Sequence, residues 1–140
     1  MKRGRLKRKR GVTLVVIDKG LLKELLESAE AFHPREVILV LRGKIEQGEG
    51  ERKINVTDYL IPPQAIHGIS SSAFNPHMIP IDFSIVGTMH SHPSGVLIPS
   101  ITDLNFMVGF FAVIVGPPYR DSRDVAAFDR RGEPVHLVVE

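Results

Sequence analysis

The sequence predicts an α/β (α+β) fold in which a mixed β-sheet is sandwiched by helices. Val- and Ile-rich segments, which are typical of strands, recur along the chain. Only residues 20–32 and 100–110 have the pattern of a helix. The resulting order, β-α-β-β-β-α-β-β-β, places each helix between strands, where it can pack on a sheet. At 140 residues, the chain is long enough to form one domain with its own core.

The first strand and helix are predicted from composition and periodicity. Residues 11–18 are rich in Val, Ile and Thr, which predicts a strand. In residues 20–32 the apolar side chains gather on one helical face, and Pro34 marks the point by which that helix ends. Residues 36–43 form an almost continuous apolar run closed by Gly43, which predicts a central strand covered on both faces.

The middle of the chain is more difficult to interpret. Residues 44–52 are polar and Gly-rich, which predicts a hairpin loop, and residues 52–63 are its expected partner strand. Residues 64–82 mix strand signals with prolines and give no clear prediction. Residues 83–92 predict a strong strand.

The last third of the chain predicts a loop, a helix and three strands. Residues 93–99 are expected to form the loop, and residues 100–110 begin like a helix. Residues 111–118 predict a buried strand that stops at two prolines. Residues 123–140 predict a hairpin that turns at Arg131-Gly132.

The positive charge of the chain is concentrated at its N-terminus. Residues 1–10 hold seven of the 18 Lys and Arg residues, so residues 11–140 have a net charge of −5 although the whole chain has +2. Because blocks of like charge are usually disordered, we expect residues 1–10 to be a basic, disordered arm and residues 11–140 to be a single domain. The arm either contacts nucleic acid or another acidic surface, or is a solvated tail.

Composition excludes several kinds of site and location. The chain has no Cys, so it has no disulfides, thiolate metal ligands or Cys nucleophiles. No stretch approaches the roughly 20 apolar residues of a membrane span. The basic residues 1–10 are not followed by the apolar region of a secretory signal, so we expect a cytoplasmic protein with no membrane partner.

Residues 90–103, HSHPSGVLIPSITD, contain two of the six histidines one residue apart. Side chains alternate along a strand, so His90 and His92 project to the same side, with Cα atoms roughly 6.5–7 Å apart. Two imidazoles at this spacing can converge on one metal ion, whereas Ser91 between them points the other way. Pro93 then ends the strand.

Asp103 is the candidate for a third ligand, but an alternative explanation is equally consistent with the local sequence. Ser100 and Asp103 have the spacing of a capping box at a helix start, which requires no metal. The two explanations are compatible for Ser100, because a serine at a helix start can also offer its hydroxyl to a neighbouring site. Two imidazoles and one carboxylate leave a fourth tetrahedral position for water, as in catalytic zinc sites.

A hydrolytic site also needs a carboxylate that does not bind the metal. Glu36 opens the apolar strand VILVL, where burial would raise its pKa. Alternatively, Glu36 only marks a strand end at the surface. Asp82 is the competing base, but a strand rise of about 3.3 Å per residue puts it some 26 Å from His90, which is too far.

The spacing H-x-H-x7-S-x2-D, together with the upstream segment HPREVILVLRGK, resembles the JAMM motif of the JAMM/MPN-plus zinc metalloproteases, and the layout is most similar to small stand-alone archaeal members. The resemblance extends from about residue 12 to the C-terminus. It implies an MPN/cytidine-deaminase-like fold. It differs in the strand after the glutamate, where the bulky Val37-Ile38-Leu39 replaces the small residue and glycine common in the family.

The resemblance also implies the roles of five residues. His90, His92 and Asp103 would bind one zinc ion per chain, Glu36 would be the general acid/base, and Ser100 would steady the oxyanion. The implied activity is that of a zinc isopeptidase or peptidase that cleaves after the C-terminal Gly-Gly of ubiquitin-like modifier or sulfur-carrier proteins. A homodimer is also plausible for this fold by analogy.

Three alternatives to this function remain open at this point. The chain could be a non-catalytic MPN-type scaffold, a nucleic-acid-associated protein that uses the basic arm, or a deaminase, although deaminases usually rely on thiolate ligands. We also expect segment 67–76 and loop 93–98 to form the channel for a Gly-Gly tail. Of the remaining histidines, His33 precedes Pro34 and is expected at the helix end. The others, which have no partner at ligand spacing, are His67, His77 and His136.

Overall fold

A computed structural model describes residues 12–62, 66–67 and 83–140. The predicted basic arm and nearly all of residues 64–82 lie outside the described residues. The division into an arm (1–10) and one domain (11–140) therefore stays a prediction.

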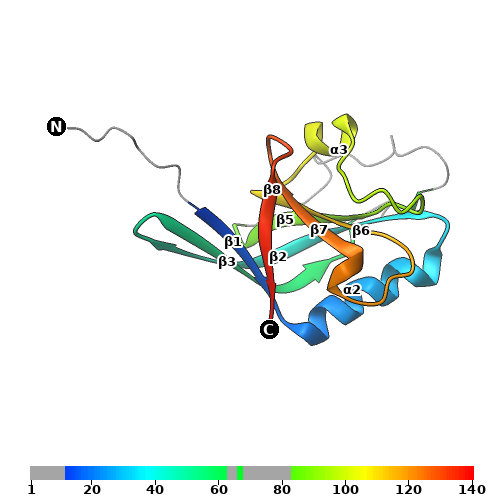
Figure 1. Ribbon diagram of the computed structural model, residues 1–140, viewed down its shortest axis with the longest axis horizontal. Coiled ribbons are helices and arrows are strands. Elements are labelled where there is room, and N and C mark those ends of the chain that lie inside the picture. The colour runs from blue at the N-terminus through cyan, green and yellow to red at the C-terminus, as the bar shows by residue number, and fades with distance from the viewer. Residues whose placement is uncertain (1–11, 63–65, 68–82) are drawn as a thin grey trace.

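The described residues form a mixed α and β structure, which confirms the predicted fold class (Figure 1). Among the described residues, strands are more numerous than helices. The strands are β1 (Val12–Ile17), β2 (Glu36–Gly48), β3 (Glu51–Leu60), β4 (Ile66–His67), β5 (Ile85–Ser91), β6 (Phe111–Val115), β7 (Val125–Asp129) and β8 (Pro134–Val139). The helical segments are α2 (Lys19–Phe32), α3 (Ile101–Asn105) and the short 3-10 turn η2 (Ser122–Asp124).

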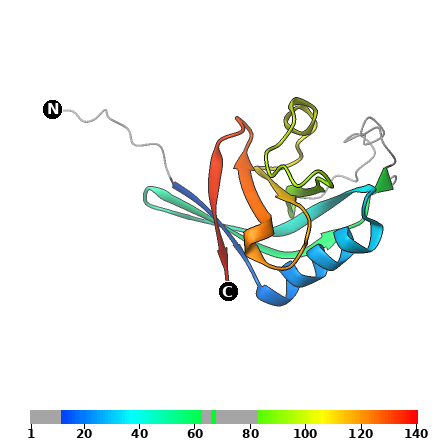
Figure 2. The same ribbon diagram turned by 45° about the vertical axis from the view of Figure 1, so that its right-hand side comes forward.

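The strands form one mixed sheet whose pairings close into a ring. The order is β3-β1-β8-β7-β6-β5-β2-β4, and β3 also pairs with β2, which closes the ring from β3 to β2. Strand β4 pairs with β2 and lies outside this ring. The β1–β3, β1–β8 and β5–β6 pairs are parallel, and the other pairs are antiparallel. Closure leaves few strand edges exposed to solvent. The sheet lies between α2 on one side and α3 on the other (Figures 1 and 2).

Helix α2 covers one face of the sheet through its apolar side. Its N-cap is Asp18, whose carboxylate accepts a hydrogen bond from the Leu21 N–H at 3.1 Å. The residues that it buries are Leu22, Leu25, Leu26 and Ala29, which recur at the spacing of one helical face. They pack against side chains from β1, β2 and β3 in the main core. None of the helices among the described residues is long and apolar enough to cross a membrane.

The central strand β2 is buried on both faces, as its apolar run predicted. Residues 37–41 are all at most 3% exposed. Val37, Leu39 and Leu41 belong to the core under α2. Alternation along the strand therefore turns Ile38 and Val40 to the opposite face, and Glu36 is on that same face. This opposite face is where the candidate site forms.

The prediction of a long hairpin loop at residues 44–52 was wrong. Strand β2 continues to Gly48, and β3 begins at Glu51, so only two residues connect them. The ladder pairs residues 44–48 with residues 51–55, which satisfies the backbone groups of this polar stretch. The apolar content of this segment is low because the hairpin projects from the body of the protein (Figure 1).

The predicted helix over residues 100–110 is also shorter than expected. Helix α3 ends at Asn105, and the chain then turns through Gly109, which has a φ of +85°. The next N–H, that of Phe110, donates to the Val86 carbonyl at 2.7 Å and leads the chain into β6. A left-handed residue cannot continue a helix, so the apolar residues after Asn105 belong to a connection. The C-terminal hairpin was predicted correctly, and Gly132 (φ +81°) lies at its turn.

Candidate active site

The register of two central strands brings Glu36 to the histidine pair. Ile38 of β2 lies opposite His90 of β5, and antiparallel pairing therefore places Glu36, two residues earlier, beside His92. The Glu36 Oε2 atom is 4.0 Å from His92 Nε2. Glu36 is thus at the start of its strand and also at the site, so it is more than a surface strand end.

Asp103 reaches the histidines from helix α3. Ser100 is the N-cap of that helix, and its hydroxyl accepts from the Asp103 N–H at 3.0 Å, while Asp103 Oδ2 accepts from the Ser100 N–H at 2.9 Å. The capping box suggested by the sequence is therefore present. The same carboxylate lies 2.9 Å from His92 Nε2 through Oδ2 and 3.4 Å from His90 Nδ1 through Oδ1.

The charges of this cluster depend on one another. Burial raises the pKa of Asp103, but the hydrogen bond from His92 and the charge of His90 outweigh burial. With a further hydrogen bond from the Ser100 N–H, they lower the Asp103 pKa to about 2. Asp103 is therefore ionised at neutral pH. Burial lowers the pKa of His92, but the hydrogen bond to Asp103 and the Val96 carbonyl raise it above its ordinary value.

Glu36 is in a different electrostatic environment. Burial is the largest effect and raises the pKa of Glu36, and the neighbouring negative charge of Asp103 raises it further. The positive charge of His92 acts in the opposite direction but does not cancel these effects. A raised carboxyl pKa brings the group closer to the range in which it can both accept and return a proton.

The donor set fits a divalent metal ion of the zinc type. His92 Nδ1 donates to the Val96 carbonyl at 2.9 Å, which leaves Nε2 as the atom that faces Asp103 and Glu36. Atoms about 2.0–2.1 Å from a tetrahedral ion are about 3.3 Å apart. The 2.9 Å and 3.4 Å separations of Asp103 from the two rings lie on either side of this value.

The described residues do not already form a complete ligand shell. Within residues 12–62, 66–67 and 83–140, no three His, Asp or Glu side chains are arranged as ligands around one point. His92 and Asp103 instead share a proton in a direct hydrogen bond. Metal ligands must be deprotonated, so an ion at this position would replace that proton and supply the positive charge between the two groups. The residues His90, His92 and Asp103 are suited to hold such an ion.

The structure thus brings together the predicted site residues Glu36, His90, His92 and Asp103, and it places Ser100 beside Asp103 in the cap. The roles of these five residues stay predictions. Ser100 is exposed, and its hydroxyl accepts from the Asp103 N–H, so its own proton points elsewhere.

Sequence reasoning missed several contacts around the site. Ser91 was expected to have no part in it, but its buried hydroxyl accepts a hydrogen bond from the N–H of Val37, next to Glu36. Only the position of Ser91 between the two histidines could have indicated this contact. The register also places the backbone of His67 in β4 opposite Glu36.

Other residues that were considered for the site are placed as follows. His33 is the C-cap of α2, as predicted, and its ring contacts Tyr119. His136 is exposed in β8. Asp82 and His77 lie outside the described residues.

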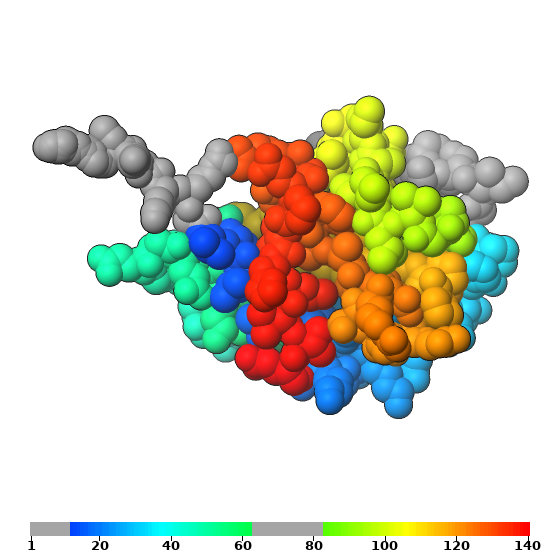
Figure 3. Space-filling view, viewed as in Figure 1, coloured from blue at the N-terminus to red at the C-terminus, as the bar shows by residue number. Residues whose placement is uncertain are grey.

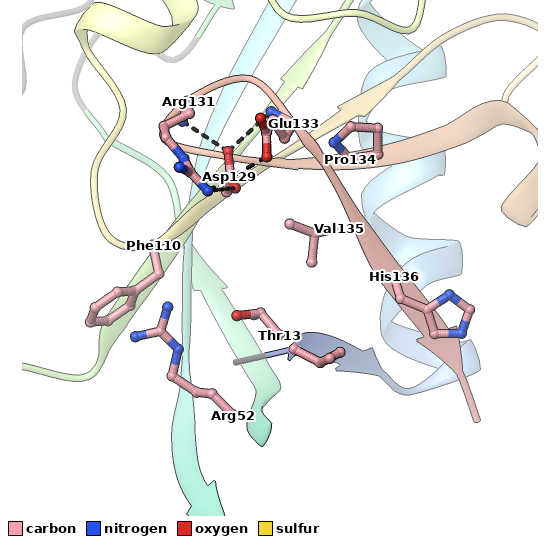
Figure 4. Close-up of a pocket in the computed structure, with 10 residues that line it drawn as sticks. Thr13, Arg52, Phe110, Asp129, Arg131, Glu133, Pro134, Val135 and His136 are labelled. Carbon is pink, nitrogen blue, oxygen red and sulfur yellow. Dashed lines mark hydrogen bonds and ion pairs between the residues drawn. The ribbon is translucent and has the colours of Figure 1, made fainter. Parts of the chain in front are cut away.

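A hollow of about 530 Å³ lies elsewhere on the surface and contains none of the five site residues (Figure 4). Its charged side chains mostly interact with one another. Arg131 lies 3.5 Å from Glu133 and 4.0 Å from Asp129, and Arg52 stacks 4.9 Å from the centre of the Phe110 ring. The cluster around His92 therefore stays the candidate site.

Similarity to known proteins points to the same family as the motif. Residues 18–131 match the family model that describes prokaryotic homologues of the JAB domain. The chain is 39% identical to a probable metalloprotease from Haloferax volcanii over 132 residues, which are 92% of this chain and 80% of that protein.

Two solved structures share the fold. One is described as a JAMM metalloprotease-like zinc site in the proteasome and signalosome, with a TM-score of 0.61 and 29% identity over 91% of this chain and 98% of that chain. The other is a JAB1/MPN domain protein from Archaeoglobus fulgidus, with a TM-score of 0.55 and 30% identity over 88% of this chain and 96% of that chain. The fold, the motif and the sequence match agree, and the chain belongs to the JAB (JAMM/MPN) domain family.

Proposed function

We propose that this protein is a zinc-dependent isopeptidase or peptidase that hydrolyses the amide bond after the C-terminal Gly-Gly of ubiquitin-like modifier or sulfur-carrier proteins. Two relationships support the metalloprotease part of this proposal. The Haloferax volcanii relative is named a probable metalloprotease, and one structural relative is described by its metalloprotease-like zinc site. The donor set of two imidazoles and one carboxylate is that of catalytic zinc.

One observation carries the proposal. A carboxylate that is not required as a ligand, Glu36, lies 4.0 Å from the Nε2 atom of His92, and its pKa is raised by burial. Bound zinc would supply a Lewis acid that acidifies water and polarises the scissile carbonyl. The Glu36 carboxylate would accept the proton of the attacking water and pass it to the nitrogen of the leaving amine.

The other residues of the site would orient the metal ligands and stabilise the negative charge that develops on the substrate. The Val96 carbonyl fixes the ring of His92 by accepting from Nδ1, and the Ser100 N–H orients the carboxylate of Asp103. The Ser100 hydroxyl, whose oxygen already accepts from the Asp103 N–H, can donate its proton to the oxygen on which negative charge develops. A rigid capping box thus supports both a ligand and a donor.

The surface beside the site supports a protein substrate. The loop that links His92 to α3 exposes Val96 (54%) and Ile98 (63%), and Ile101 follows at 78% exposure. Figure 3 shows this loop and α3, coloured green to yellow, as a projecting part of the surface. Exposed apolar side chains that lie together typically contact a partner. We propose that loop 93–98 contacts the modifier tail, whose glycines can pass close to backbone. Apart from residue 67, segment 67–76, the other expected side of the channel, lies outside the described residues.

The test is cleavage of two fusions of a small modifier protein, one linear and one isopeptide-linked, by the purified protein with zinc. We expect cleavage after Gly-Gly. Excess chelator should abolish cleavage, and added zinc should restore it. Glu36→Gln should lower kcat by about 100-fold or more, because it removes the proton acceptor, but should leave zinc content at one ion per chain.

Glu27→Gln is the matched control, because Glu27 is an exposed carboxylate on α2. It should cleave like the wild type. Equal cleavage by Glu36→Gln, or cleavage that survives the chelator, would contradict the mechanism. A protein that holds no zinc and cleaves neither fusion would instead be a scaffold of the same fold.

A further inference from the structure

The proposed reaction requires Glu36 to remain at a fixed distance from the metal ligands, although it belongs to a different strand. Glu36 is the first residue of β2, and the β2–β5 ladder begins only at the Ile38–His90 pair. A strand end frays unless something beyond the ladder holds it. Pairing with the two residues of β4 supports Glu36 and Val37 along one edge. The question is therefore what fixes this backbone relative to β5 and the residues before the strand. This inference rests on the function proposed above.

The first support lies on the C-terminal side of Glu36. Ser91, between the two site histidines, is fully buried, and its Oγ accepts from the Val37 N–H at 2.8 Å. The hydroxyl thus continues the cross-strand contact past the last ladder pair. Because Ser91 shares its backbone with both His90 and His92, this bond links the peptide next to Glu36 directly to the strand that carries two of the candidate ligands.

The second support lies on the N-terminal side of Glu36. The ring of His33, three residues earlier, hydrogen-bonds through Nδ1 to the Tyr119 hydroxyl at 2.8 Å, and the two rings pack edge to face at 5.5 Å. Tyr119 is only 7% exposed, and its φ of +59° is unusual for a residue other than glycine. Such a strained backbone is maintained where surrounding contacts fix it, often at functional sites.

We propose that Ser91 and Tyr119 are positioning residues that brace the chain after and before Glu36, respectively, and so hold its carboxylate at the metal ligands. Neither touches the reacting atoms. Ser91 bonds the backbone N–H next to Glu36, whereas Tyr119 holds the ring of His33, three residues before Glu36. The two residues come from different parts of the fold, β5 and the connection after β6. Proton transfer depends steeply on the distance between the groups, so loss of either brace should lower kcat rather than substrate binding.

Burial and chemistry argue against a purely space-filling role for Ser91. A buried hydroxyl is unfavourable unless it is hydrogen-bonded, and alanine or valine would fill a strand interior without that requirement. The one bond found for this hydroxyl among the described residues is to the peptide beside Glu36. Tyr119 is similar, because phenylalanine would keep the ring contact with His33 and would lose only the hydrogen bond of the hydroxyl.

The test uses variants that remove only the hydroxyl. Ser91→Ala and Tyr119→Phe remove the two braces, and Ser91→Thr keeps the hydroxyl of the first. Tyr59→Phe is the matched control, because the Tyr59 hydroxyl bonds Glu24 of α2 at 3.3 Å, away from the site. We expect each brace variant to lower kcat about 10–100-fold with KM unchanged. Ser91→Thr should recover most of the lost rate, and the control should not change it.

Zinc affinity, measured by competition with a chromophoric chelator, separates this role from an effect on the ligands. It should stay within about twofold of the wild type in all variants. A rate that returns to normal when Ser91→Ala is saturated with zinc would overturn the proposal, because Ser91 would then act through metal binding. Equal loss of rate in Ser91→Thr would also overturn it.

Two measurements do not require activity. In zinc-free protein, amide exchange at Val37 should accelerate about 10-fold or more in Ser91→Ala and not in Ser91→Thr. In labelled wild-type protein, adding zinc should shift the carboxyl ¹³C resonance of Glu36, and this response should weaken in both brace variants.

If the wild type cleaves neither fusion but these signals behave as expected, the proposed function fails and the positioning role stands. Unchanged signals in the variants would overturn the positioning role.

Discussion

The carboxylate of Asp103 accepts hydrogen bonds from the backbone N–H of Ser100 and from the ring of His92 through the same oxygen, Oδ2. The sequence offered a helix cap and a metal ligand as competing explanations for this residue. The structure shows the cap, and it also shows the cap directing the second oxygen toward His90 at 3.4 Å. A capped carboxylate has little freedom to rotate, which is an advantage for a ligand.

A second residue near the site gives a prediction about stability. Thr88 is fully buried in β5, two residues before His90, and its hydroxyl has no hydrogen-bond partner among the residues that the structure describes. Burying such a group is unfavourable. Thr88→Val has nearly the same shape and removes the polar atom, so we expect the free energy of unfolding to rise by about 1 kcal/mol.

Denaturation by urea in the presence of a chelator measures this change. Thr57→Val is the matched control, because Thr57 is exposed, and it should change stability by less than about 0.5 kcal/mol. Destabilisation by Thr88→Val would show that the hydroxyl has a partner in solution, for example a buried water.

Among the secondary-structure elements, strand β2 has the most varied contacts. Its first residues pair with β4 and β5, and its later residues pair with β3 as a projecting hairpin. The register with both β3 and β5 shifts near Arg42 and Gly43, which marks a β-bulge. A bulge allows one strand to serve a buried, site-forming half and an exposed half.

Gly43 allows the register shift of β2 at the bulge. A Cβ at position 43 would overlap the backbone carbonyl of Asn55 in β3, which cannot move without breaking the ladder. We therefore expect Gly43→Ala to lower the free energy of unfolding by about 2 kcal/mol or more.

Gly48→Ala is the control in the same strand, because a Cβ at position 48 would make an ordinary contact of 3.5 Å. It should cost less than about 0.5 kcal/mol in thermal or urea unfolding. Equal effects of the two substitutions would mean that strand propensity, and not the close approach at position 43, determines the loss.

Over the whole molecule, the closed ring of strands determines which segments meet. Glu36 begins β2 and His92 directly follows β5, and pairing within the closed sheet fixes these two strands relative to one another. Asp103 of α3 joins them through its contact with His92. The cluster combines two carboxylates with two imidazoles in a largely buried place. Such an arrangement is stable only with positive charge between the carboxylates, supplied by a protonated histidine or by a metal ion.

The need for a positive charge at this place predicts how stability depends on pH. The stability of zinc-free protein and the stabilisation by added zinc should change in opposite directions. The His92 pKa is raised above its ordinary 6.5, so the stability that its proton contributes is present below pH 6.5 and is lost as pH rises through the folded-state pKa. The Asp103 pKa is lowered from 3.8 to about 2, so its contribution is present above pH 3.8 and lost as pH falls toward 2. Zinc-free protein should therefore lose stability from pH 6 to pH 9.

Zinc competes with the His92 proton, so its effect should increase over the same range. At 100 times its Kd, zinc should stabilise the fold by about 2.7 kcal/mol. Differential scanning calorimetry at pH 6, 7.5 and 9, with zinc or with chelator, measures both trends. A stabilisation by zinc that is equal at all three pH values, or that persists in Asp103→Asn combined with His92→Gln, would place the ion elsewhere.

The sequence by itself determined the elements and most of the candidate chemistry. Apolar periodicity identified α2 and the buried strands, and the spacing of His90, His92, Ser100 and Asp103 identified the motif. Both are local properties, and alternation in a strand or a cap at a helix start depends on only a few neighbouring residues. Local patterns failed where a polar segment was paired by its partner, as in the β2–β3 hairpin.

The tertiary structure decided which of these groups meet. Pairing of Ile38 with His90 and the contacts of Ser91 and Tyr119 join residues more than 50 positions apart. Register and long-range contacts depend on the packing of the whole chain, and no short stretch contains that information. For this reason, the sequence left two explanations for Glu36, a general base or a surface strand end, whereas the structure placed its carboxylate beside His92.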